Sequence, residues 1–185
     1  MMVSVNSPID ISYMRGILLT LMLSAVVAFG AVADDDRHFI WGAEAGTGID
    51  MGGDNMSTIN LRALLGYSGP YIEVAGIGAG VDMVMSNSTR MYPVYAHLRS
   101  SFTRKPSLLF GDLRGGIAFN QIPSVGERRS FFLQPGVGIH LATGATFSSY
   151  LTLSYTYNSL SFYGDKADSI IHGLNLATIA IGVTF

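Results

Sequence analysis

Apolar and polar residues alternate with a period of two along most of the chain after residue 36. In one stretch, Leu151, Leu153 and Tyr155 alternate with Thr152 and Ser154. Successive side chains of a β-strand point to opposite faces, so this alternation is typical of strands with one apolar and one polar face. The chain is therefore predicted to be all-β.

Eight such segments fit between residues 34 and 185. Each is long enough to cross a lipid bilayer as a tilted strand, which takes about 9–11 residues. The predicted strands are residues 37–49, 57–67, 71–85, 90–102, 107–120, 129–141, 149–158 and 174–185. Gly, Pro, Asn, Asp and Ser separate them, which are the residues that turns favour.

An even number of antiparallel strands joined by short turns predicts a single up-and-down barrel. In a bacterial barrel both ends of the chain then lie in the periplasm. The loops near 50–56, 86–89, 121–128 and 159–172 would face outward, and the last would be the longest.

Composition decides which face of the strands meets lipid. Charged residues make up 13% of the chain, and after residue 36 the lysines are Lys105 and Lys166. A soluble β-sandwich with the same alternation would need more charge on its polar face. Small and polar residues suit a narrow lumen, so the apolar face is predicted to point outward. Aromatic residues near the strand ends are predicted to form interfacial girdles: Phe39, Trp41, Tyr67, Tyr71, Phe102, Phe131, Tyr150, Tyr157 and Phe185.

Glu73 does not fit this alternation. By its position in the predicted strand 71–85 it faces lipid. We therefore expect it to lie near the rim, or a β-bulge at the glycines of that strand to shift the register.

The N-terminal region has the pattern of a secretory signal peptide. Met14-Arg15 precedes an apolar run from Gly16 to Phe29, and Ala31-Val32-Ala33 precedes three aspartates. A positive segment, a short apolar segment and an A-x-A site define such a signal. Residues 1–33 are predicted to be removed after Ala33, which leaves residues 34–185 as the barrel domain, and Met14 is a candidate translation start. The alternative is an uncleaved N-terminal anchor.

The chain ends on Phe185, at the end of the alternating stretch IAIGVTF. A terminal aromatic residue on an amphipathic last strand resembles the signal by which outer-membrane barrels are recognised for assembly. Together with the signal peptide it predicts export to the outer membrane of a Gram-negative cell, with the barrel-assembly machinery as a partner.

Four stretches also resemble a known family. They are RMYPVYAHLRSSF (90–102), SLLFGDLRGGIAF (107–119), FFLQPGVGIHL (131–141) and YLTLSYTYNSL (150–160). Together with the terminal strand they are similar to the small outer-membrane β-barrel proteins of the Bacteroides group, over roughly residues 70–185. The resemblance implies a fold and a location, and it implies no catalytic residues.

The candidate site is the set of polar residues predicted to face the lumen. It has three acids and three arginines, with two histidines and other polar residues nearby: Glu44, Asn60, Arg62, Asp82, Tyr95, His97, Arg99, Asp112, Arg114, Gln134 and His140. An eight-stranded barrel has a lumen that side chains can fill, and buried charges must be paired. A balanced set therefore predicts a plugged lumen with a structural role, although a binding site or proton relay would use the same residues.

Two other functions remain open. A lipid A-modifying enzyme would need a nucleophile such as a serine beside a histidine. No histidine of the chain is followed two residues later by serine. A dispersed triad of His97, Asp112 and a serine is nevertheless compatible with the sequence. A small channel or ligand carrier would need an open path. The preferred reading is a barrel, not an enzyme, with a structural or interaction role in the cell envelope and with membrane lipid and lipopolysaccharide as partners.

The cysteine content and the net charge exclude further kinds of site and partner. The chain has no cysteine and a net charge of −2. A disulfide framework or cysteine-based metal site is therefore excluded, and nothing indicates nucleic acid as a partner. Neither a metal nor another cofactor is predicted.

Overall fold

The computed structural model of the protein describes residues 38–69, 72–86, 88–102, 107–123, 126–144, 146–163 and 170–185. The predicted signal peptide and its cleavage site lie outside the described residues. None of the described residues belongs to a helix long and apolar enough to cross a membrane.

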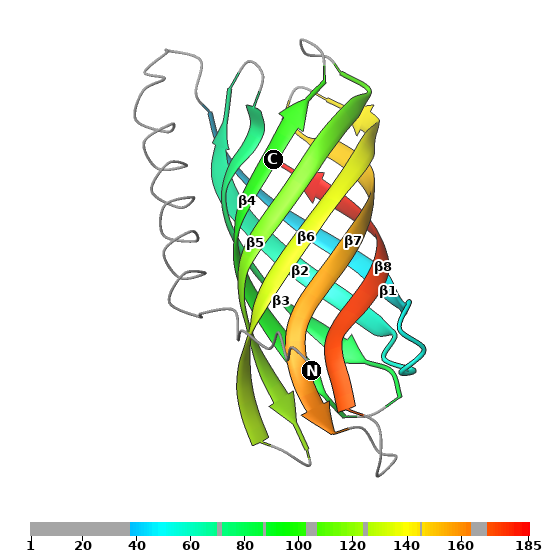
Figure 1. The fold of residues 1–185 in the computed structure, drawn as a ribbon. Coiled ribbons are helices and arrows are strands. Elements are labelled where there is room, and N and C mark those ends of the chain that lie inside the picture. The colour runs from blue at the N-terminus through cyan, green and yellow to red at the C-terminus, as the bar shows by residue number, and fades with distance from the viewer. Residues whose placement is uncertain are drawn as a thin grey trace, which may run out of the picture. The chain divides into compact units, whose positions relative to one another are not determined.

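Eight antiparallel strands form one closed barrel in chain order, as the sequence predicted (Figure 1). Each strand pairs with its neighbours in sequence, and β1 pairs with β8 to close the wall, from Gly42 opposite Thr184 to Asp50 opposite Leu176. The strands are β1 (His38–Asp50), β2 (Thr58–Ser68), β3 (Ile72–Val84), β4 (Arg90–Ser101), β5 (Leu109–Ile122), β6 (Gly126–Thr143), β7 (Ser148–Tyr163) and β8 (Ile170–Thr184). Closure leaves no unpaired sheet edge, which is the condition for a β-structure in lipid.

The barrel has two distinct ends. We call the end where β1 begins and β8 finishes the terminal end, and the opposite end the loop end. At the loop end the connections 121–128 and 159–172 are shorter than predicted, because pairing continues to Ile122 opposite Gly126 and to Tyr163 opposite Ile170. Backbone hydrogen bonds do not require apolar side chains, so the strands extend past the point where the alternation fades.

The two faces of the wall differ as the alternation predicted. On β7, Leu153 is 60% exposed, whereas the adjacent Thr152 is 2% exposed. At the terminal end, exposed aromatic residues contact one another in pairs: Trp41 stacks on Phe185 with ring centroids 4.7 Å apart, and Phe39 meets Tyr67 edge-on at 5.9 Å. Exposed aromatic residues near strand ends are typical of the boundary between lipid and water.

Two of the described residues, Tyr150 and Glu73, face inward although the girdle assignment or the plain alternation places them outside. Tyr150 was assigned to the girdle but is 0% exposed, because it shares the inward parity of Thr152. Glu73 lies at the second position of β3, near the rim as one of the two expectations required, and a register irregularity between Ile72 and Val74 turns it inward. A bulge was the other expectation, but it lies at Glu73 itself and not at the glycines of β3.

Candidate functional site

The structure places the sequence-predicted candidate residues on the inner face of the wall. All of them are buried except His140, which is partly exposed near the terminal end. Ten of these side chains are 6% exposed or less: Glu44, Asn60, Arg62, Asp82, Tyr95, His97, Arg99, Asp112, Arg114 and Gln134. They do not form one cluster but a column of linked groups.

The central group is built around Asp112 on β5. Its Oδ2 lies 2.7 Å from Nε2 of His97 and accepts a hydrogen bond from Nε of Arg99 at 3.0 Å. Its Oδ1 accepts from Nε of Arg114 at 2.8 Å. Arg114 also donates from both terminal nitrogens to Glu44, at 2.6 and 2.8 Å. Arg114 thus joins two carboxylates from β1 and β5 across the lumen.

A second group, centred on Arg62, lies beside the first. Arg62 donates to both oxygens of Asp82, at 3.1 and 3.3 Å, and to Oε1 of Gln134. Gln134 in turn donates to Ser154 at 2.7 Å, which extends the hydrogen bonding to β7. Opposite charges in contact offset part of the cost of removing each from water.

Aromatic rings lie against the arginines of these groups, and of these rings the sequence predicted Tyr95 for the lumen but not Phe110, Phe132 or Tyr150. The Arg99 guanidinium lies 4.3 Å from the Phe110 ring centroid and 3.8 Å from that of Tyr150. Arg62 lies 5.3 Å from the Phe132 ring. These distances allow cation–π attraction. The signal in the sequence is parity, since Phe110, Phe132 and Tyr150 each lie two positions before a residue that faces inward.

Glycines make room for the inward rings. Tyr95, Phe110 and Tyr150 each stand directly opposite a glycine on the neighbouring strand, at Gly78, Gly138 and Gly182 respectively. A Cβ at these glycines would come within 2.2–2.5 Å of a ring atom. The glycines of the polar face therefore let large rings lie flat across a narrow lumen.

A further group at the terminal end includes Glu73, which the sequence reading had not placed in the lumen. Ser101 donates to Glu73 at 2.5 Å, and Nε2 of His140 lies 3.0 Å from both Glu73 oxygens. Nδ1 of His140 lies 2.8 Å from the hydroxyl oxygen of Ser148. The bulges at Glu73 and next to His140 bring these side chains together from β3 and β6.

The loop end of the lumen is apolar. Buried apolar side chains from the loop-end parts of the strands and from the β1–β2 connection form one cluster: Met56, Val84, Met91, Ile122, Leu160, Leu174 and Leu176. The polar column therefore ends against an apolar layer instead of leading to water. This arrangement is typical of a filled barrel and does not provide a wide aqueous path.

Among the described residues, no serine completes the hypothetical triad with His97 and Asp112. His97 uses Nε2 for Asp112, and Nδ1 has no hydrogen-bond partner among the described residues. A nucleophilic serine would have to contact that second nitrogen. Within the described ranges, no group of three or more His, Asp or Glu side chains is placed to hold a metal ion.

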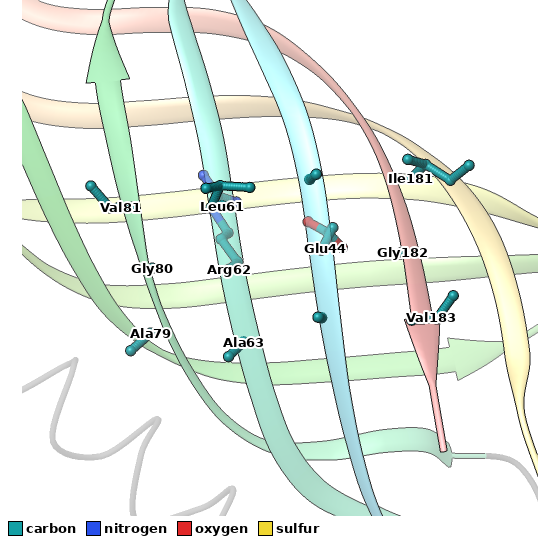
Figure 2. A pocket seen from close by; sticks show the side chains of 12 residues that line it. Glu44, Leu61, Arg62, Ala63, Ala79, Gly80, Val81, Ile181, Gly182 and Val183 are labelled. Atoms are coloured by element: carbon teal, nitrogen blue, oxygen red, sulfur yellow. The ribbon is translucent and has the colours of Figure 1, made fainter.

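A shallow hollow lies on the outer wall across β8, β1, β2 and β3 (Figure 2). Small outward residues form its floor, and larger apolar residues flank them: Ala43, Ala45, Ala63 and Ala79, with Leu61, Val81, Ile181 and Val183. Glu44 and Arg62 are buried behind them at 6% and 5% exposure. The hollow is a feature of the apolar exterior and not an entrance to the lumen network.

The barrel is closed and antiparallel, its outer wall is apolar, its interior is charged and hydrogen-bonded, and exposed aromatic residues lie at one end. These features define the class of small transmembrane β-barrels. The chain is also similar to several solved structures. The N-terminal β-barrel domain of OprF from Pseudomonas aeruginosa is 12% identical, with a TM-score of 0.48 over 79% of this chain and 97% of that one.

Neisserial surface protein A is 15% identical, with a TM-score of 0.49 over 80% of this chain and 95% of that one. The de novo designed protein TMB2.3 is 13% identical, with a TM-score of 0.42 over 82% of this chain and 96% of that one. No protein-family model and no curated protein matches the chain. The resemblance to barrels of the Bacteroides group stays a prediction.

Proposed function

We propose that this protein is an exported barrel of the Gram-negative outer membrane with a structural or interaction role, and that its lumen is plugged by its own side chains. It would be inserted by the barrel-assembly machinery, with Phe185 as part of the recognised signal, and would contact lipopolysaccharide and other outer-membrane lipid. The loop end would face the cell exterior.

The observation that carries the proposal is the contrast between the two faces of the wall. The outward residues are apolar, as at Leu153 and Ile181, which are 60% and 53% exposed. The inward residues are ion-paired, and an apolar cluster closes the column at the loop end. An apolar exterior of this kind is stable in lipid and would aggregate in water.

The paired charges in the lumen favour a structural role over a channel. The acids Glu44, Asp82 and Asp112 each contact an arginine, so that no strong field of one sign lines a path. A selective pore would favour one sign of charge. We therefore expect the purified protein to leave planar lipid bilayers without channel openings.

The test is to express the full chain in a Gram-negative host, separate the membranes, and run the protein on gels with and without boiling. The proposal predicts an outer-membrane protein whose mobility changes on boiling, because a closed barrel resists detergent until heated. A soluble periplasmic protein with unchanged mobility would refute membrane placement. Regular conductance steps in planar bilayers would instead refute the plugged lumen.

A further inference from the structure

Two exposed arginines lie on the outer face of the wall at the loop end. Arg90 begins β4 and Arg129 lies near the start of β6, with β5 between these strands. We call them the rim arginines. Neighbouring strands are about 5 Å apart, so β4 and β6 are about 10 Å apart, and two long side chains can reach one group between them.

The strand register gives this surface a definite order. Arg90 stands opposite Gln121, and Gln121 stands opposite Glu127. One step further down the wall, Tyr92 stands opposite Phe119, and Phe119 stands opposite Arg129. The Arg129 guanidinium lies 5.6 Å from the Phe119 ring centroid. Arg90 thus lies one step above an exposed aromatic row and Arg129 lies at the end of that row, where Tyr92 and Phe119 are 37% and 44% exposed.

The rim arginines differ from the arginines of the lumen in their partners. Arg62, Arg99 and Arg114 each form an ion pair with an aspartate or glutamate. In the part of the chain that the structure describes, no carboxylate forms an ion pair with a rim arginine, and Glu127 is the acid nearest to them in the strand register. Like charges held together repel, so this surface favours an external anion.

We infer that the rim arginines bind the phosphate group of an anionic lipid in the leaflet at the loop end. The planar guanidinium matches phosphate geometry with two parallel hydrogen bonds, and the aromatic row below lies at the height expected for the boundary between headgroups and acyl chains. A phosphate on a lipid fits this position better than a soluble anion, because the membrane holds it beside the wall. The inference rests on the membrane placement proposed above.

The experiment uses the full-length barrel purified from membranes in neutral detergent. Native mass spectrometry would measure the binding of diphosphorylated lipid A and of the same glycolipid with both phosphates removed. We expect the phosphorylated form to bind about tenfold more tightly, and Arg90→Gln with Arg129→Gln to remove most of that preference. Glu127→Gln should strengthen binding because it removes the opposing charge.

Gln121→Ala is the matched control, since it alters the same surface without changing charge and should leave the preference intact. Equal binding of the two lipids by a barrel that fractionates with the outer membrane would overturn this inference alone. A protein that is absent from the membrane would overturn the proposed function as well. Displacement of lipid A by an equal concentration of inorganic pyrophosphate would identify a site for soluble anions and overturn the lipid assignment.

Discussion

Arg114 is the residue on which the central lumen network depends most. It is 2% exposed and holds both Glu44 and Asp112. Two carboxylates would otherwise be left in a dry interior with fewer partners. Removing one member of a buried ion pair lowers the free energy of unfolding by more than the intact pair adds to it, because no water replaces the lost partner of the remaining charge.

Replacement of Arg114 by Met should therefore lower the free energy of unfolding by about 3–5 kcal/mol. Denaturant titration of the barrel in lipid vesicles, followed by Trp41 fluorescence, measures this change. Arg128→Met is the control, because Arg128 is exposed and its loss should change stability by less than about 0.5 kcal/mol. Equal effects of the two substitutions would show that the buried network contributes little.

The sequence predicted the inward side of most polar residues, because a strand has a fixed period of two. It did not predict their partners. That Arg114 would meet Glu44 rather than Asp82 depends on how the strands are staggered when the barrel closes, which the alternation does not encode. Glu73 was the second limit: its misfit to the alternation indicated an irregularity, but the sequence did not show that the bulge lies at Glu73 itself.

At the scale of the strands, a glycine opposite an inward aromatic residue leaves the space that its ring occupies in the lumen. Phe110 on β5 occupies the space above Gly138 on β6. Its ring atoms and a backbone oxygen, that of Leu151, would all lie within 2.7 Å of an added Cβ at Gly138. Neither the ring, packed on Arg99, nor the backbone has room to retreat.

Gly138→Ala should therefore destabilise the barrel by about 1–3 kcal/mol, the usual cost of overpacking. Gly115→Ala is the matched control: the nearest atom to its added Cβ is a Leu133 side-chain carbon at 3.7 Å, an ordinary contact. The heating temperature at which each variant loses its unboiled gel mobility ranks their stabilities. A Gly115 variant as unstable as the Gly138 variant would indicate a general requirement for glycine instead of a ring-packing one.

Strand number and order were predictable at this scale, but strand ends were not. Turn residues such as Gly53 and Asn55, both with positive φ, mark the β1–β2 connection clearly. The segment 126–128 is polar, with Glu127 and Arg128, and was predicted as loop. It is nevertheless paired with β5, because a strand that extends beyond the bilayer no longer needs an apolar face.

At the scale of the whole molecule, the barrel wall is apolar outside and polar inside, and we therefore expect lipid to surround the barrel. The absence of cysteine allows each position to be labelled singly without a background. Neighbouring residues of β7 offer the sharpest contrast: Leu153 and Tyr155 are exposed on the outer wall, whereas Thr152 and Ser154 are buried in the lumen.

The most direct test is to place a spin label at each of these four positions in vesicle-reconstituted protein and compare its collisions with oxygen and with a water-soluble nickel complex. We predict frequent oxygen collisions at 153 and 155, few collisions of either kind at 152 and 154, and frequent nickel collisions at Met51, which is 64% exposed in a loop. Labels at 153 and 155 that meet the nickel complex as often as a label at Met51 would contradict the membrane-barrel account.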